Sequence, residues 1–198
     1  KGELTNFDKY QKKLEKKDPE QIFLNSLHVV GKAPQTVKDL KHTRYGFPAC
    51  GIKAAVVRAA TTSDEKMVDA RMAFHVYADF IPDDDSDQVE LFTPNPPRLR
   101  RDIGRIPKTG TVNTLYRGEF LEWTMKVRVR YLSNLVSCQQ LLAWFETAGL
   151  VVGIGEWRPC GKNSTGSHGC FVVKSAVAHE YTAPAITQKV EPAKAEKP

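Results

Sequence analysis

The chain has 198 residues, of which 41% are hydrophobic and 26% are charged, an ordinary composition for a soluble globular protein. This length allows one domain with a substantial core. No apolar run approaches the roughly 20 residues that cross a bilayer, and no signal-peptide pattern follows the basic N-terminus. We therefore expect a cytoplasmic protein with no membrane partner.

The net charge of +6 is unevenly distributed along the chain. Residues 1–18 form a basic N-terminal arm, and residues 181–198 form a tail rich in Ala, Pro, Lys and Glu that we predict to be disordered. Between them, residues 19–180 form the predicted domain, in which an acidic block over 79–90 precedes a basic block over 98–108. Charge separated in this way produces a field that steers a polyanion.

The first third of the domain predicts a strand, a basic loop and a helix. Residues 22–30 are rich in apolar and β-favouring residues and end at Gly31, which predicts a strand. Residues 32–47 form a basic loop. The Ala-rich run 50–60 carries its larger apolar residues on one side, which predicts a short helix.

The middle of the domain predicts strands interrupted by an insertion. Residues 73–81 and 88–92 are expected to be two strands joined by an acidic turn. A basic, hairpin-like insertion is expected over about residues 82–116. Residues 120–131 then alternate strictly between apolar and polar side chains, so one face of this strand is buried and the other is wet.

The last third predicts a helix, a glycine-rich loop and a closing strand. Residues 138–148 carry an apolar stripe, with a capping box at the start and Gly149 as the predicted end. A glycine-rich stretch leads to a last strand at about 170–175. This order predicts an α+β fold, with a ferredoxin-like or RRM-like antiparallel sheet, helices on one face and the basic insertion.

Two stretches resemble a known superfamily. The run from Tyr45 to Arg58, with Pro48, Gly51 and Lys53, resembles the loop and helix after the first strand of repeat-associated mysterious proteins (RAMPs). The tract GIGEWRP followed by GSHGCF resembles their glycine-rich loop. The chain is similar to backbone subunits of CRISPR effector complexes but is shorter, so a phage or prophage relative is expected.

The resemblance implies a ligand and an assembly. RAMP backbone subunits coat single-stranded nucleic acid and stack along it, so we expect sequence-independent binding of RNA or single-stranded DNA, with self-assembly along the strand. It also implies that residues 98–108 act as a mobile thumb. The predicted nucleic-acid-binding residues are Lys41, Arg44, Tyr45, Lys53, Arg58, Arg98, Arg100, Arg101, Arg105, Lys126, Arg128, Arg130, Trp157 and Arg158.

Physical arguments support several of these residues. Lys53 in the first turn of a helix would add a cation to free backbone N–H groups. The wet face of strand 120–131 ends in Lys126, Arg128 and Arg130, a cationic stripe that matches phosphates. Aromatic residues such as Tyr45 and Trp157 are candidate platforms for base stacking. The alternatives are an ordinary helix surface, a solvated sheet face and aromatics that anchor the core.

Other functions remain open at this point. His42, in the basic loop, is the candidate general acid or base of a metal-independent endoribonuclease. The charged patches alternatively indicate a phage-encoded interaction protein that docks on a host complex. We predict no cofactor and no metal, because Cys160, His168 and Cys170 match no standard zinc spacing and the aspartates of 83–87 are typical of a solvated turn.

Overall fold

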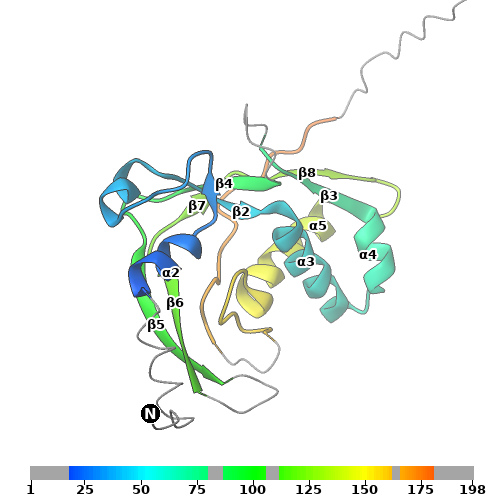
Figure 1. Cartoon of the computed structure of the whole chain (residues 1–198). Helices are drawn as coiled ribbons and strands as arrows, with labels where there is room; N and C mark the ends of the chain where they lie inside the picture. Colours follow the sequence, from blue (N-terminus) through cyan, green and yellow to red (C-terminus); the bar gives the residue numbers. More distant parts are fainter. Residues whose placement is uncertain (1–17, 80–86, 106–111, 162–165, 181–198) are drawn as a thin grey trace, which may run out of the picture.

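The computed structural model of the chain describes residues 18–79, 87–105, 112–161 and 166–180 (Figure 1). All of the predicted arm except Asp18, and all of the predicted tail, therefore lie outside the described residues, as do most of the acidic turn and Lys108. The described elements are α2 (Pro19–Asn25), β1 (Val29–Val30), a 3₁₀ helix (Val37–His42), β2 (Arg44–Pro48), α3 (Ala49–Ala60), a 3₁₀ turn (Thr61–Ser63), α4 (Met67–Ala73), β3 (Phe74–Tyr77), β4 (Gln88–Phe92), β5 (Arg98–Arg105), β6 (Val112–Glu119), β7 (Thr124–Met125), β8 (Arg128–Tyr131), α5 (Cys138–Thr147) and a π turn (Ala148–Val152).

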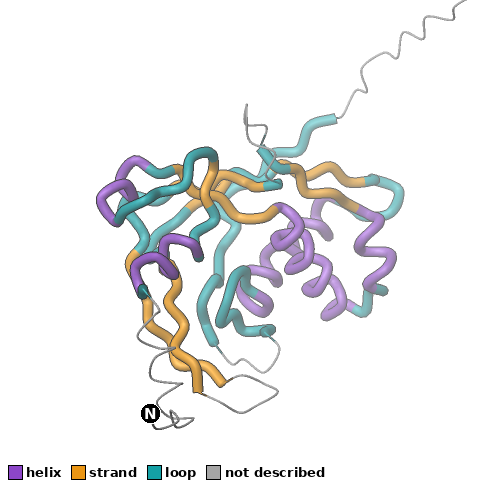
Figure 2. The backbone as a smooth tube through the Cα atoms, viewed as in Figure 1, coloured by secondary structure: helices purple, strands orange, loops and turns teal. Residues whose placement is uncertain are grey.

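Residues 124–131 join two antiparallel sheets. Their first part, β7, pairs with β4 at the end of the sheet β1-β2-β4-β7, and their second part, β8, pairs with β3. The strands lie along one side of α3, α4 and α5 (Figures 1 and 2). The predicted α+β class, with an antiparallel sheet and helices on one face, is confirmed.

The main core lies between these strands and the helices. Phe74 and Val89 from the strands and Val56 from α3 are fully buried, and Trp144 of α5 is almost so. The rings of Phe74 and Trp144 lie 6.4 Å apart. The strand predicted over 120–131 forms only as β7 and β8, and Leu121, expected on its buried face, is 67% exposed. Over residues 122–131 the predicted alternation is present, because each odd-numbered side chain is half-buried and each even-numbered one is exposed. This segment therefore has one core face and one solvent face.

The strand predicted over 22–30 was wrong. Pro19 begins a helix there, and the Asp18 side chain accepts a hydrogen bond of 2.9 Å from the Glu20 N–H, which caps the helix N-terminus. The apolar residues Phe23 and Leu24 pack against Leu40 as one side of a short helix. Capping and tertiary packing outweigh the β-favouring composition, and only β1 remains extended.

The closing strand predicted at 170–175 was also wrong, because the described residues 170–180 contain no helix or strand. The Phe171 N–H donates to the Gly149 carbonyl at 3.0 Å, and its ring lies 6.4 Å from that of Trp123. Phe171 also packs against the main core, so this segment is attached without becoming a strand.

The remaining predicted elements formed, with changes in their partners or ends. The strands expected at 73–81 and 88–92 exist as β3 and β4, but they pair with β8 and with β2 and β7 rather than with each other. The helix from Cys138 is confirmed, and the Ser137 hydroxyl accepts from the Gln140 N–H. Gly149 does not end it, because the π turn continues to Val152 before Gly153 turns the chain.

The predicted insertion contains a two-stranded hairpin, β5–β6, but its strands extend to Glu119, and β4, inside the predicted bounds of 82–116, belongs to the larger sheet. On one face, Gly118 lies under Leu27 and Phe23 and donates its N–H to the Ser26 hydroxyl at 3.1 Å. The opposite face carries the charged residues Arg98, Arg100, Asp102, Arg117 and Glu119. Helix α2 thus covers one face and leaves the charged face for other contacts.

Candidate nucleic-acid interface

The strand layer has an open face on the side away from the helices. We define this open face by the exposed side chains His75, Tyr77, Phe92, Thr124, Lys126, Arg128 and Arg130, together with the half-buried Glu90. Three of its cations, Lys126, Arg128 and Arg130, project at alternate positions of one segment. Successive side chains on one face of a strand lie roughly 6.6 Å apart. The structure thus places the predicted cationic stripe on solvent-exposed surface.

Neighbouring groups position the two arginines of the stripe. The Arg128 guanidinium donates to the Ala78 carbonyl at 2.8 Å and lies 3.4 Å from an Asp79 carboxylate oxygen. The Arg128 side chain nevertheless remains 62% exposed. The Arg130 guanidinium lies over the Tyr77 ring, 5.2 Å from its centroid. Both cations therefore have fixed positions and still face solvent.

Arg44 is engaged by a carboxylate. Its guanidinium donates to both oxygens of Glu90, at 2.7 and 2.9 Å. The hydrogen bond and charge of Arg44 hold the pKa of Glu90 below its usual value, although burial opposes this shift. Lys41 and His42 lie nearby in the chain and are both exposed. Arg44 therefore adds little net charge to this region.

The RAMP-like segment is partly structural. Tyr45 is only 3% exposed and donates its hydroxyl to the Leu40 carbonyl at 2.7 Å, so the prediction that it stacks on bases was wrong. Burial also raises its pKa. Gly51 lies inside helix α3, which begins at Ala49, so Lys53 is not in the first turn as predicted.

Lys53 and Arg58 lie at different places on α3. The Lys53 ammonium is 3.2 Å from the His75 imidazole and 5.8 Å from the centroid of the Phe74 ring. Arg58 is exposed in the last turn, where a cation interacts favourably with the helix C-terminus. Only Lys53 contacts a residue of the open face.

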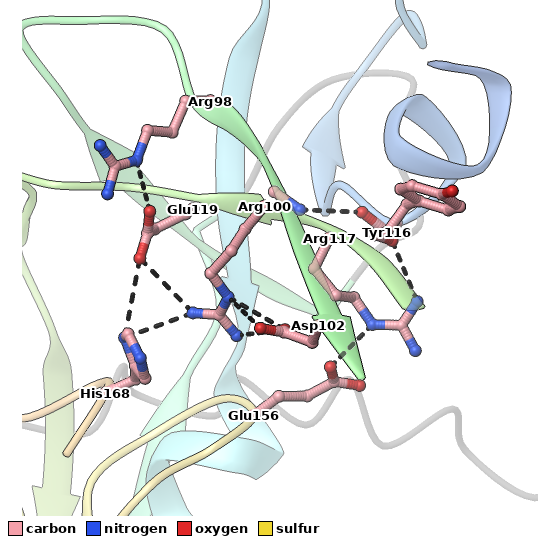
Figure 3. A network of polar contacts seen from close by, with 10 residues as sticks. Arg98, Arg100, Asp102, Tyr116, Arg117, Glu119, Glu156 and His168 are labelled. Carbon is pink, nitrogen blue, oxygen red and sulfur yellow. Dashed lines mark hydrogen bonds and ion pairs between the residues drawn. The ribbon is translucent and has the colours of Figure 1, made fainter. Parts of the chain in front are cut away.

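Two of the hairpin arginines, Arg98 and Arg100, are ion-paired (Figure 3), although the Arg98 side chain remains 62% exposed. Arg98 lies 2.5 Å from one oxygen of Glu119, and Arg100 lies 2.8 Å from Asp102 and 3.5 Å from the other oxygen of Glu119. His168, from the glycine-rich stretch, accepts from Arg100 at 3.3 Å. Residues 98–108 were expected to be a basic block, but the hairpin register places Glu119, from outside that block, directly opposite Arg98.

A second ion pair ties the hairpin to the glycine-rich stretch. Arg117 of β6 lies 2.7 Å from Glu156 (Figure 3). Together with the contact between Arg100 and His168, this pair holds the charged face of the hairpin against Glu156 and His168. A thumb that moves freely over a ligand is inconsistent with these contacts at its base.

Glu119 makes this network sensitive to acid. Burial alone would raise its pKa, but Arg98 and Arg100 outweigh burial and hold the pKa below its usual value of 4.5. The stabilisation is therefore fully present above about pH 4.5 and is lost as the pH falls through the lower, folded-state pKa.

The substitution Glu119→Gln is expected to cost about 1–2 kcal/mol of unfolding free energy at pH 7, because it leaves Arg98 and Arg100 with one carboxylate instead of two. Urea unfolding at pH 7 and pH 3 checks this. The difference between wild type and variant should shrink at pH 3, and a difference that stays constant with pH would contradict the assignment.

The other predicted residues are dispersed. Arg101 is exposed on the hairpin face opposite the ion-pair network, where it pairs with Tyr116 across the strands. The side chain of Arg105 lies outside the described part of the chain. Trp157 is 38% exposed with a positive φ of 57°, and Arg158 donates to the Gly155 carbonyl at 2.8 Å. The structure therefore does not bring the predicted residues into one site.

The glycines of residues 149–169 allow the chain to approach itself. A Cβ on Gly149 would lie 2.1 Å from the Phe171 carbonyl oxygen, and one on Gly169 would lie 1.7 Å from that of Ile154. The Ile154 N–H donates to the Gly169 carbonyl at 3.0 Å. At both glycines, the group that approaches closely is therefore the protein's own backbone.

The sequence analysis missed two aromatic residues of the open face. Tyr77 and Phe92 are 41% and 50% exposed. Both were assigned to strands without attention to which face they occupied. The available signal was that each directly follows an inward-facing residue, the half-buried Val76 and the buried Leu91, and successive side chains of a strand point to opposite faces.

Other candidate sites are not assembled. A cleft of about 580 Å³ lies beside α2 and β1, and its lining contains none of the predicted binding residues. Among the described residues, no group of three His, Cys, Asp or Glu side chains is arranged to hold a metal ion. None of the helices in the described ranges has the length and apolar character to cross a membrane. Comparisons of the chain with protein-family models, curated proteins and solved structures find no match.

Proposed function

We propose that this protein binds single-stranded RNA or DNA through backbone phosphates, with the open face as its binding surface. The observation that carries the proposal is the row of exposed cations Lys126, Arg128 and Arg130 at alternate positions of one segment. Phosphate contacts of this kind give affinity without sequence preference. The resemblance to RAMPs further supports assembly of several copies along one strand and a phage or prophage origin.

The open face suits this role better than the hairpin. On the open face, Arg128 has one carboxylate within 4 Å and retains most of its exposure, and Lys126 is exposed. On the hairpin, Arg100 is only 18% exposed and is shared between Asp102 and Glu119. A phosphate would have to displace a carboxylate there, so the hairpin contributes less binding energy.

The test removes the positive charges of the stripe and keeps a polar side chain at each of its three positions. In the variant Lys126→Gln, Arg128→Gln, Arg130→Gln, we expect weaker binding to all strand sequences alike. The slope of log K against log salt should become shallower by about 2, since each phosphate contact on a single strand contributes roughly 0.7. Fluorescence anisotropy with labelled single strands at several salt concentrations measures both effects.

A charge-matched control separates the stripe from net charge. Lys38, Lys66 and Lys174 are exposed at separate places in the chain, and changing all three to Gln removes the same charge. In this control, the slope of log K against log salt should stay within about 0.7 of the wild-type slope, which is the contribution of one phosphate contact. Equal losses in both variants would contradict a defined binding face. Failure of the wild type to bind any strand would leave the alternative of a protein-docking factor.

A further inference from the structure

Two aromatic side chains flank the cationic stripe on the open face. Phe92 of β4 lies directly across from Thr124, and Tyr77 of β3 lies directly across from Arg128. Thr124 and Arg128 are four positions apart on one face of the segment, a distance of roughly 13 Å along a strand. Lys126 lies between them. The order along the surface is therefore aromatic, cation, aromatic.

These rings do not serve the core. Phe92 is 50% exposed, whereas its neighbour Leu91 points inward and is 9% exposed. Among the described residues, Phe92 has no ring contact with another aromatic side chain. Full burial of a phenylalanine side chain would stabilise the folded protein by roughly 2–3 kcal/mol, and part of this stabilisation is lost because half of the Phe92 side chain is in water. Its surface is available to an external planar group.

The second aromatic is already paired with a planar cation. The Arg130 guanidinium lies 5.2 Å from the centroid of the Tyr77 ring, and Tyr77 is itself 41% exposed. Nucleic-acid bases stack both on aromatic rings and on guanidinium planes. The pair formed by Tyr77 and Arg130 thus combines a stacking surface with a charge for the adjacent phosphate.

We infer that Phe92 and the pair of Tyr77 with Arg130 are stacking surfaces for unpaired bases. The inference rests on the proposed function and narrows its ligand class to strands with accessible bases. Duplexes keep their bases stacked inside, and polyphosphate has none, so neither presents a base to these rings. An extended single strand places one base on each surface and a phosphate beside Lys126.

The experiment compares two single strands of equal length and charge, and a duplex of the same length, which carries about twice their charge. Wild-type protein is titrated with a labelled ordinary single strand, with an abasic strand that keeps every phosphate, and with a blunt duplex. Base stacking contributes about 1–3 kcal/mol per base, so the ordinary strand should bind at least tenfold more tightly than the abasic strand. The duplex should also bind more weakly than the ordinary single strand.

The double variant Tyr77→Thr, Phe92→Thr should bind the ordinary strand only as tightly as it binds the abasic strand. Its affinity for the abasic strand should equal that of the wild type. The control Leu132→Thr removes a similarly exposed apolar side chain, 53% exposed, and should retain the wild-type preference. Circular dichroism and thermal melting show whether the variants fold. If the double variant unfolds, Phe92→Thr alone should still lower the preference for the ordinary strand.

Each other outcome has a distinct meaning. Equal wild-type affinity for ordinary and abasic strands, or for single strands and duplexes, overturns the stacking inference and leaves the phosphate grip standing. Equal weakening of both strands in the double variant also overturns it. Binding of no probe by the wild type overturns the proposed function itself.

Discussion

Replacing Gly169 by alanine is expected to lower the free energy of unfolding by about 2–5 kcal/mol. The φ angle of Gly169 is +69°, which disfavours any residue with a Cβ. The added Cβ would also lie 1.7 Å from the Ile154 carbonyl oxygen, and this atom belongs to rigid backbone. Chemical denaturation monitored by tryptophan fluorescence measures the loss.

Gly155→Ala is the matched control for this prediction. Its φ angle is +77°, close to that of Gly169, but an added Cβ would meet only a Phe47 ring atom, at 4.0 Å. Only the conformational cost of about 1–2 kcal/mol remains. Equal losses at the two positions would mean that the approach of Gly169 to Ile154 is not a tight contact in solution.

Replacing Phe74 by alanine is expected to cost about 3–5 kcal/mol of unfolding free energy. Phe74 is fully buried, with ring centroids 6.4 Å from Trp144 and 6.3 Å from Phe145. Truncation would leave a cavity between β3 and α5 that close-packed neighbours fill only partly. Thermal melting should show a large fall in Tm.

The control for Phe74→Ala lies on the same strand and the opposite face. Tyr77 is 41% exposed, so Tyr77→Ala should cost less than about 1 kcal/mol. A loss at Tyr77 as large as that at Phe74 would place both rings in the core and would contradict the assignment of the open face.

The sequence predicted those elements whose pattern is set by burial on one face. The alternation of residues 122–131 required one apolar side, and the structure places Met125, Val127 and Val129 on it. The helix over 138–147 was readable because Ser137 caps it and Leu141 lies on its apolar stripe. In both segments, local propensity and tertiary packing favour the same structure.

The sequence did not predict features that depend on distant partners. Whether Arg98 and Arg100 are free depends on the hairpin register, which places Glu119 opposite Arg98. The helix at Pro19–Asn25 depends on the Asp18 cap and on packing against Leu40, which is remote in sequence. The sequence predicted the cations of the open face but not its aromatic residues. Which aromatic residues lie beside these cations depends on which strands pair with residues 124–131.

The shared segment at residues 124–131 has a consequence for how the molecule assembles during synthesis. Helix α3 and strands β2, β3 and β4 precede this segment in the chain, and β3 has no other strand partner among the described residues. The Arg128 side chain reaches the Ala78 carbonyl, 50 positions earlier. Such long-range pairing slows folding, whereas the β5–β6 hairpin is local and closes in microseconds. A nascent chain on the ribosome therefore carries β3 as an unpaired edge until residue 131 has emerged, and this interval is when the protein is most exposed to aggregation.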